Sequence, residues 1–396
     1  MAGWSSGCMV HCVSTFHWRG ACWTGARRKN RNRRWRKRAL GIWLVRDDEK
    51  RSLPMLLTGL STITSFVLVY LLSRPDSPLA IPDEPNARSL HSVPVSRTGG
   101  LGILAGILLA GGLLIARQGY PVYLVALFVG ILLIASISLV DDKRGVSVRY
   151  RLAVHALAAV LFIHYGFYVG IVKLPFFSLE LPTWLAFLFS FLLILWGINL
   201  FNFMDGMDGF AGGMALVGFS SFSLLGMKAD APDFALLAAI VAGANGAFLL
   251  FNFPPARIFM GDAGSSVQGF LMAAMMLWAD AAGIFPLWIG VLIFAPFIVD
   301  ATLTLLRRTL RGERIWLAHR SHLYQRLVLS GWGHRRTVLT EYGLMLICVL
   351  LAIGAVFFPD PVLQTGIFIA SISFCILGYV FVSHHLSRQE RHAEFE

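Results

Sequence analysis

Long apolar runs separated by short polar segments make up most of this chain of 396 residues. Each run is about 20 residues long and nearly free of charge, the length that a helix needs to cross a bilayer's hydrocarbon core. Helices are expected because every backbone polar group must be hydrogen-bonded within that core. We predict an all-α polytopic membrane protein of about 10–11 transmembrane helices, at about 55–72, 99–116, 121–140, 152–171, 184–201, 209–226, 234–253, 265–282, 284–306, 338–358 and 364–383.

The composition agrees with this pattern. Hydrophobic residues make up 56% of the chain and charged residues 14%, whereas a soluble protein carries about 25% charged residues. The five cysteines show neither a disulfide framework nor the spacing of zinc ligands. Most of the net charge of +12 comes from residues 1–54, which hold 13 Lys and Arg against 3 acidic residues.

The basic residues also predict which side of the membrane each connection faces. Connections after odd-numbered spans contain 18 Lys and Arg, and those after even-numbered spans contain 3. Because basic residues favour the cytoplasmic side, the odd connections are predicted to be cytoplasmic. Residues 385–396 then form a cytoplasmic tail, and residues 55–384 the membrane domain.

The segment 1–54 contradicts this topology, which places its 13 basic residues outside. It has no apolar signal-peptide core. Two explanations stay open, a wrongly assigned start with translation from Met55 or a disordered basic arm, and the first is favoured. Its basic run 27–38 could suggest nucleic acid or anionic lipid, but we predict no nucleic-acid partner.

Four polar motifs follow odd-numbered spans and so share the cytoplasmic face. The first is Asp141-Asp142, whose adjacent carboxylates repel each other unless a cation relieves them. The second contains Asn202, Asp205 and Asp208, with glycines that let the backbone approach a ligand closely. Carboxylates that converge at a membrane surface suggest metal-assisted chemistry on a phosphorylated substrate.

The third motif runs from Asn252 through Phe259 to Asp262, at the start of a predicted helix, where an anion or metal site is favoured. The fourth contains His319, Arg320 and His322, which are donors suited to phosphoryl groups. A purely structural explanation exists for each motif: a solvated helix end, a polar turn, an N-cap and a basic lipid-facing loop. Their shared face favours function.

Several other polar residues are weaker candidates. His155, His164 and Asn245 fall within spans, where they are predicted to form hydrogen bonds between helices. Asp300 lies about two turns inside a span, and an ionisable residue there is functional by default. No P-loop sequence is present, so ATP-driven chemistry has no support. A secondary transporter is the rival class, but transporters place polar residues near the midplane of two repeats, and no repeat is evident.

The four motifs, in this order, resemble the polyprenyl-phosphate N-acetylhexosamine-1-phosphate transferases over about residues 55–336. The segment from Ser92 to Gly102, which contains Arg97, is similar to that family's first cytoplasmic loop. The resemblance implies transfer of HexNAc-1-phosphate from a UDP-sugar to undecaprenyl (polyprenyl) phosphate, with Mg²⁺, or alternatively Mn²⁺, as cofactor. It also implies a bacterial inner-membrane enzyme whose active-site groove faces the cytoplasm.

The resemblance assigns roles residue by residue. Asp141, Asp142, Asp205, His319 and His322 are implied to be catalytic, and Asp262 and Asp142 to bind the metal. Substrate binding is implied for the residues of the nucleotide and phosphate pockets, with Asp208 on the uracil: Asn202, Asp208, Asn252, Phe259, Arg320 and Arg97. We expect Asp141 to act as the base, with a covalent aspartyl intermediate on Asp141 or Asp142 as the alternative.

The sequence differs from one branch of this family, the MurNAc-pentapeptide transferases, at two places. The MurNAc-pentapeptide transferases have consecutive histidines and a lysine three residues after the acidic pair, whereas this chain has H-R-S-H at His319 to His322 and Gly145. The pattern looks closer to enzymes that initiate O-antigen in lipopolysaccharide synthesis. The sugar is left open among GlcNAc, FucNAc and QuiNAc, and the oligomeric state between a monomer and a homodimer.

Residues 1–54 are predicted to be dispensable, because the charge pattern becomes self-consistent from Met55 onward. Expression from Met55 should retain membrane insertion and activity, measured on washed membranes. Loss of either would refute the prediction, as would N-terminal sequencing of the native protein that finds residues upstream.

Overall fold

The computed structural model describes residues 47–85, 90, 93–314 and 319–393. The chain divides into two units, Met1–Arg51 and Ser52–Glu396. Most of the predicted N-terminal extension therefore lies outside the described residues. Its last residues belong to helix α2, which begins at Asp47, eight residues before Met55.

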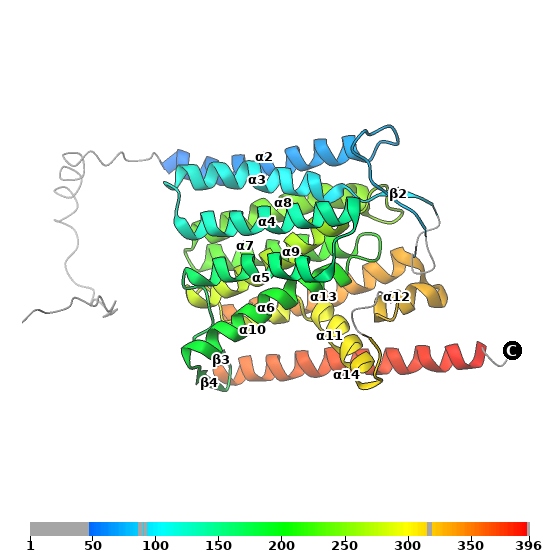
Figure 1. Ribbon diagram of the computed structural model, residues 1–396. Coiled ribbons are helices and arrows are strands. Elements are labelled where there is room, and N and C mark those ends of the chain that lie inside the picture. The colour runs from blue at the N-terminus through cyan, green and yellow to red at the C-terminus, as the bar shows by residue number, and fades with distance from the viewer. Residues whose placement is uncertain (1–46, 86–89, 91–92, 315–318, 394–396) are drawn as a thin grey trace, which may run out of the picture. The chain divides into compact units, whose positions relative to one another are not determined.

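The structure confirms an all-α polytopic architecture (Figure 1). Eight helices among the described residues are long and apolar enough to cross a membrane, and nine if a bent pair counts as one span. The helices are α2 (Asp47–Leu72), α3 (Gly99–Arg117), α4 (Val122–Arg144), α5 (Val148–His164), α6 (Thr183–Phe203), α7 (Phe210–Lys228), α8 (Pro232–Asn252), α9 (Gly261–Ala281), α10 (Leu287–Ile293), α11 (Ala295–Leu310), α12 (Leu323–Leu327), α13 (Gly333–Phe357) and α14 (Pro361–Ala393). A π-helical turn, η1 (Val328–Trp332), joins α12 to α13.

Two predicted spans, α5 and α9, are helical but are not among those eight. The first is only 17 residues long. The second is too polar, although every residue from Ala263 to Asp280 is buried. Helix α9 contacts α3, α4 and α6 (Figure 1), so its polar side chains meet protein instead of lipid. Gln268 of α9, for example, donates to Asn245 of α8 at 3.1 Å, which confirms the predicted inter-helix role of Asn245.

The predicted span 284–306 is wrong as a single helix. The structure breaks it into α10 and α11, which meet at an angle of 85°. Pro296 accounts for the break, because it has no N–H to donate to the carbonyl of Leu292 and its ring crowds the preceding turn. The bend sends α11 toward α12 and α14, which it contacts.

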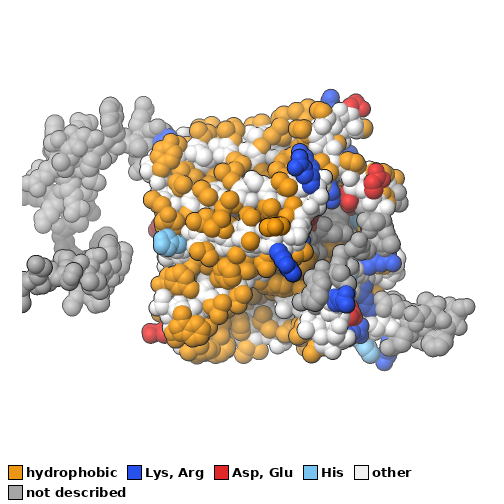
Figure 2. All heavy atoms as spheres, viewed as in Figure 1, with side chains coloured by type: hydrophobic (Ala, Val, Ile, Leu, Met, Phe, Trp, Pro, Cys, Tyr) orange, Lys and Arg blue, Asp and Glu red, His pale blue; other side chains and the backbone are white. Residues whose placement is uncertain are grey.

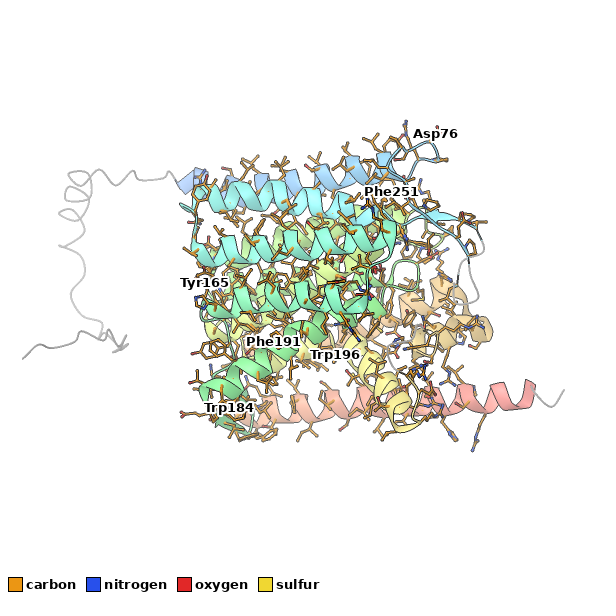
Figure 3. The ribbon with its side chains drawn as sticks, in the orientation of Figure 1. Asp76, Tyr165, Trp184, Phe191, Trp196 and Phe251 are labelled. Carbon is orange, nitrogen blue, oxygen red and sulfur yellow. The ribbon has the colours of Figure 1, made fainter. Side chains whose placement is uncertain are left out.

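Short strands and aromatic residues complete the fold. Strands β3 (Ile171–Leu174) and β4 (Phe177–Glu180) form an antiparallel hairpin in which Ile171 pairs with Glu180. Exposed Trp184 and Tyr165 lie at the end of the helices opposite Asp76 (Figure 3), as expected of an aromatic belt at a membrane interface. Strands β1 (Pro82–Asp83) and β2 (Val95–Ser96) pair ahead of α3.

Charged side chains mark the other end of the helices. Figure 2 shows an apolar surface over most of the visible face, with Lys, Arg, Asp and Glu gathered at the end where β2 and α12 lie. The last helix, α14, ends at Ala393, ten residues beyond the predicted span 364–383. The predicted tail is therefore helical over most of its length.

Small residues allow α9 to pack closely against its neighbours. A Cβ built on Gly269 overlaps the carbonyl oxygen of Gly197 in α6, and one built on Gly100 of α3 overlaps backbone atoms of Gly264. Such contacts let the backbones of membrane helices approach each other, as small residues do in membrane interfaces generally.

Gly269→Ala should therefore lower the stability of the protein by about 1–3 kcal/mol, the typical cost of overpacking. Gly112→Ala in α3 is the matched control, because nothing lies within 4 Å of the added Cβ. The control should be neutral or stabilising by up to about 1 kcal/mol, since alanine favours helix. Thermal unfolding of the purified protein in detergent measures both. Equal midpoint temperatures for the two variants would contradict the packing argument.

Candidate active site

Asp262 in the first turn of α9 is the centre of the site. Its Oδ1 accepts a hydrogen bond of 3.0 Å from Asn202 Nδ2, at the end of α6. Its Oδ2 lies 3.5 Å from Arg151 Nη1, at the start of α5. The Asp262 side chain is 38% exposed, so one side of the carboxylate stays open to a ligand.

The preceding Gly261 fixes the direction in which α9 starts. Its φ is +73°, and a Cβ at this position overlaps the carbonyl oxygen of Arg97. A glycine is therefore needed both for the left-handed backbone and for the close approach.

The acidic pair lies at the end of α4, beside two arginines. Asp141 accepts from Val146 N at 2.6 Å and from Arg151 Nη1. Arg151 thus joins Asp141 to Asp262. Asp142 is buried, and its Oδ1 lies 3.6 Å from Arg97 Nη1. Arg97 Nη2 also donates to the Asp142 carbonyl at 2.6 Å. The structure thus brings four of the predicted residues, Asp141, Asp142, Asp262 and Arg97, into one cluster with Arg151.

Asp205 adds a third carboxylate to Asp142 and Asp262. It lies in the turn between α6 and α7. Burial, and then the negative charges of Asp262 and Asp142, raise the pKa of Asp205 well above its ordinary value. Three aspartates from separate parts of the chain therefore repel one another in one place. We call Asp142, Asp205 and Asp262 the acidic cluster.

Backbone hydrogen bonds attach the loop before α3 to the third motif. Phe259 N donates to Ser96 O at 2.7 Å, Gly99 N donates to Phe259 O at 2.9 Å, and Gly100 N donates to Met260 O at 2.8 Å. This short ladder holds Arg97 beside the acidic cluster. The resemblance implies that Arg97 binds substrate. The ladder fixes the position of Arg97, and its role toward substrate stays a prediction.

The predicted nucleotide-pocket residues make contacts with the protein itself. Asn252 accepts from Gly209 N at 2.9 Å and donates to Ile258 O at 2.8 Å. Asp208 accepts from Ala256 N at 3.0 Å. Asn252 is buried, whereas Phe259 is half-buried. Asn252 and Asp208 thus fix the turns around the pocket, and their roles toward a nucleotide stay predictions.

His334 is a residue of this region that the sequence did not single out. Its Nδ1 lies 3.1 Å from Asp208 Oδ1, and its Nε2 lies 3.2 Å from the Leu90 carbonyl oxygen. The available signal was its position at the start of α13, just after the glycines of G-W-G. Nothing in the local sequence linked it to Asp208, 126 residues away.

The fourth motif is fixed by Asp300 of α11. This buried carboxylate accepts from the backbone N of Leu323 at 2.8 Å and of Tyr324 at 3.1 Å, the first residues of α12. Tyr324 OH then donates to the Phe203 carbonyl at 3.1 Å, which attaches α12 to the end of α6. Asp300, predicted to be functional, positions the motif in the structure.

The two histidines of the motif lie side by side, with ring centroids 4.9 Å apart. His322 is buried, and its Nδ1 lies 3.7 Å from Asp300 Oδ1. Burial, His322 and Arg308 lower the pKa of His319 to about 4. His319 is therefore neutral at physiological pH, and its Nδ1 is 2.8 Å from Ser321 Oγ. Arg320 is exposed.

The acidic cluster fits a magnesium ion that is bound together with substrate. No three His, Cys, Asp or Glu side chains in the described part of the chain are placed to enclose a metal ion alone. Mg²⁺ does not need such a cage, because it commonly takes one or two protein carboxylates and completes its shell with phosphate and water. The partly exposed Asp262 carboxylate, its repulsion with neighbouring acids and the nearby arginines suit that arrangement.

A cavity of about 70 Å³ adjoins Asp262, between α4, α5, α6 and α9. His155, Asn202 and Arg151 are among its lining residues. His155 was predicted to hydrogen-bond between helices, but its Nε2 has no partner among the described residues. That prediction is wrong, because the ring faces this cavity. His164 is exposed at the end of α5 and contacts the ring of Tyr165, so its predicted inter-helix role is also wrong.

Comparison with known proteins agrees with these motifs. Residues 124–280 match the model of glycosyl transferase family 4. Over 315 residues the chain is 27% identical to the probable undecaprenyl-phosphate N-acetylglucosaminyl 1-phosphate transferase of Bacillus subtilis, covering 79% of this chain and 87% of the relative.

Two other relatives are named for the transfer of different sugars. The decaprenyl-phosphate N-acetylglucosaminephosphotransferase of Mycobacterium tuberculosis is 28% identical over 340 residues, which cover 77% of this chain and 84% of that protein. The phospho-N-acetylmuramoyl-pentapeptide-transferase of Listeria welshimeri is 26% identical over 250 residues, 59% of this chain and 74% of that protein. The match to glycosyl transferase family 4 and these relatives agree with the resemblance of the chain's motifs to the polyprenyl-phosphate N-acetylhexosamine-1-phosphate transferases.

Proposed function

We propose that this protein transfers N-acetylhexosamine 1-phosphate from a UDP-sugar to a polyprenyl phosphate, giving a polyprenyl-diphosphate-sugar and UMP. The observation that carries the proposal is the acidic cluster with Arg97 and Arg151, at the end of apolar helices. Acidic and cationic groups that converge at a membrane surface suit a reaction between a lipid phosphate and a nucleotide diphosphate.

In the proposed reaction, an oxygen of the polyprenyl phosphate attacks the β-phosphorus of the UDP-sugar. The bond from that phosphorus to the bridging oxygen breaks, and UMP leaves with the bonding electron pair. Asp262 and Asp142 would hold Mg²⁺, which neutralises charge on the diphosphate and improves UMP as a leaving group. Arg97 and Arg151 orient the phosphoryl oxygens, so that positioning supplies much of the catalysis.

The contacts of Asp141 favour direct transfer over a covalent aspartyl intermediate. One of its oxygens is held by Val146 N and the other by Arg151. A carboxylate whose two oxygens are both engaged is poorly placed to act as a nucleophile. The lipid phosphate already carries negative charge, so little proton removal is needed. We therefore assign Asp141 the task of holding Arg151, in place of the expected role as base.

The two ends of the UDP-sugar are assigned to different motifs. Asp208, Asn252 and Phe259 surround the nucleotide in this proposal, with His334 fixing Asp208. His319, Arg320 and His322 face the sugar and its phosphate. Because His319 is neutral, it offers a hydrogen bond without adding charge.

The relatives favour GlcNAc as the first sugar to test, because two of them are named for its transfer. The H-R-S-H sequence resembles that of O-antigen-initiating enzymes, so the 6-deoxy sugars FucNAc and QuiNAc should be tested as well. In the cell, the reaction would begin a surface polysaccharide such as O-antigen, at the cytoplasmic side of the inner membrane. A transporter is disfavoured, because the acidic residues lie at helix ends on one face.

A membrane assay with polyprenyl phosphate, Mg²⁺ and a panel of radiolabelled UDP-sugars tests the function. We expect radiolabelled polyprenyl-diphosphate-sugar with at least one N-acetylhexosamine, and stoichiometric UMP. Vesicle uptake of label without lipid product would instead indicate a transporter. The ranking of UDP-GlcNAc, UDP-FucNAc and UDP-QuiNAc identifies the sugar.

Activity should require a divalent metal and the charges of Asp262 and Asp142. Asp262→Asn and Asp142→Asn should each lower UMP release by about 100-fold or more, as expected for groups that stabilise transition-state charge. Asp76→Asn is the matched control, because Asp76 is exposed in the loop after α2 and is not part of the acidic cluster. EDTA should abolish the activity and added Mg²⁺ should restore it. Unchanged UMP release in EDTA would refute the metal assignment.

A further inference from the structure

A second charged site lies between α11, α12 and α14, in a pocket of about 720 Å³. Five arginines line it, at positions 307, 308, 311, 320 and 326. Among the described residues that line it, Glu313 is the one carboxylate, and it pairs with Arg308 at 2.9 Å. Among its described lining residues, arginines therefore outnumber carboxylates, and the pocket is cationic. We call it the arginine pocket.

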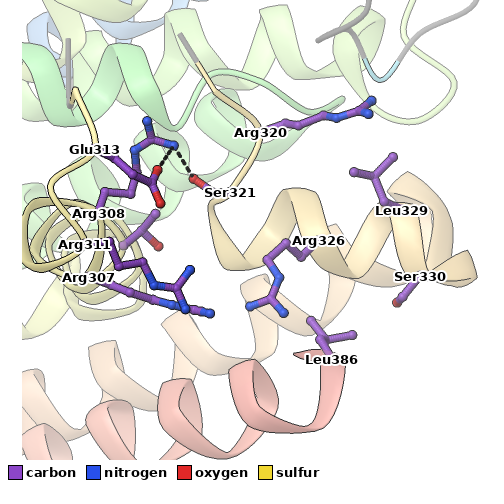
Figure 4. A pocket seen from close by; sticks show the side chains of 11 residues that line it. Arg307, Arg308, Arg311, Glu313, Arg320, Ser321, Arg326, Leu329, Ser330 and Leu386 are labelled. Carbon is purple, nitrogen blue, oxygen red and sulfur yellow. Dashed lines mark hydrogen bonds and ion pairs between the residues drawn. The ribbon is translucent and has the colours of Figure 1, made fainter. Parts of the chain in front are cut away.

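Arg307 and Arg326 come unusually close together in this pocket. Arg307 Nη1 and Arg326 Nη1 donate to the same oxygen, Ser383 Oγ, at 2.8 and 3.0 Å. Figure 4 shows Arg307, Arg311 and Arg326 pointing toward one another, whereas Arg320 points away. Guanidinium groups stay charged and repel each other. Guanidinium groups that converge in this way suit an anion, because phosphate oxygens match their paired N–H donors.

The position of the pocket indicates a membrane-bound anion. Ser383 lies near the end of the candidate membrane span Pro361–Arg388 of α14. A second cavity of about 480 Å³ adjoins the pocket and shares Ser330 and Leu386 with it. This neighbour is largely apolar, with Leu327 and Phe374 in its wall. A cationic pocket that adjoins an apolar cavity is complementary to an amphiphile with an anionic head.

We propose that the arginine pocket binds the phosphodiester headgroup of an anionic membrane phospholipid, with an acyl chain in the adjoining apolar cavity. Basic pockets between membrane helices on the cytoplasmic side bind such headgroups. This site is separate from the acidic cluster and goes beyond the proposed transfer reaction.

The bound lipid would also act on the fourth motif. Arg308 Nη1 donates to Ser321 Oγ at 3.2 Å, and Ser321 lies between His319 and His322. Arg326 belongs to α12, directly after that loop. Neutralising the arginines with a lipid phosphate therefore holds the loop and α12 against α11 and α14.

Native mass spectrometry of the purified full-length chain tests the proposal. Phosphatidylglycerol and phosphatidylcholine with identical acyl chains are titrated in parallel. We expect phosphatidylglycerol to bind at least tenfold more tightly than phosphatidylcholine. Arg307→Gln/Arg326→Gln should abolish this preference. Arg335→Gln/Arg336→Gln is the control, because it removes the same charge from two exposed arginines at the start of α13, outside the pocket.

Further arms separate the possible sources of phosphate. Glycerol 3-phosphate and inorganic phosphate should compete poorly, and competition equal to that of the whole lipid would show a soluble-anion site instead. Preferential binding of polyprenyl phosphate over phosphatidylglycerol would assign the pocket to the acceptor substrate. Either result overturns the proposal, as would equal binding of the two phospholipids.

If the double variant does not fold, the exposed single variant Arg311→Gln decides the matter. It should weaken phosphatidylglycerol binding several-fold and leave phosphatidylcholine binding unchanged, and no change in either would refute the proposal. None of these measurements needs a transfer reaction. A failure of the proposed function therefore gives a different result from a failure of the lipid site.

Discussion

Repulsion among three aspartates is the constraint on which the rest of this structure depends. Asp142, Asp205 and Asp262 come from a helix end, a turn and a helix start. Burial, and then the charges of Asp262 and Asp142, raise the pKa of Asp205. Isolated carboxylates at a membrane surface would move apart. They stay together because they are held at the ends of packed helices or in the turn between α6 and α7, and because Arg97 and Arg151 lie beside Asp142 and Asp262. The three carboxylates leave an excess of negative charge, which a metal ion bound with substrate would neutralise.

Close packing around α9 is what places Asp262 in that cluster. Gly269 meets Gly197 of α6, and Gly264 meets Gly100 of α3, so the helix is held along its length by backbone contact. At the start of α9, the backbone of Gly261 lies against the carbonyl oxygen of Arg97. The same loop carries the Arg97 side chain to Asp142. A helix buried on all sides thus serves as the fixed axis for groups that come from α4, α6 and the first loop.

The sequence predicted the parts of the structure that depend on one-dimensional patterns. Apolar length gave the helices, and the asymmetry of basic residues placed the four motifs at one end, where the structure brings them into contact. It could not predict contacts made by residues far apart. His334 meets Asp208 across 126 positions, and the ring of His155 turns toward a cavity instead of a neighbouring helix.

The bend at Pro296 also escaped prediction, since apolar residues lie on both sides of the proline and the run looks continuous. Hydropathy reports where a chain avoids water, but it does not report whether the helix is straight. The contacts of Asp300 follow from the same bend, because a straight span would not carry this residue to α12.

The bend finally explains how two opposite charge sites share one membrane face without neutralising each other. Carboxylates of the acidic cluster and the guanidinium groups of the arginine pocket would form salt bridges if they met. Helix α12 lies between them, held by Asp300 at its start and by Tyr324, whose hydroxyl donates to the Phe203 carbonyl of α6. Arg326 of the same helix reaches in the other direction, to Ser383 of α14. Because α11 turns by 85° and brings Asp300 to α12, a single proline-induced break keeps the two sites apart.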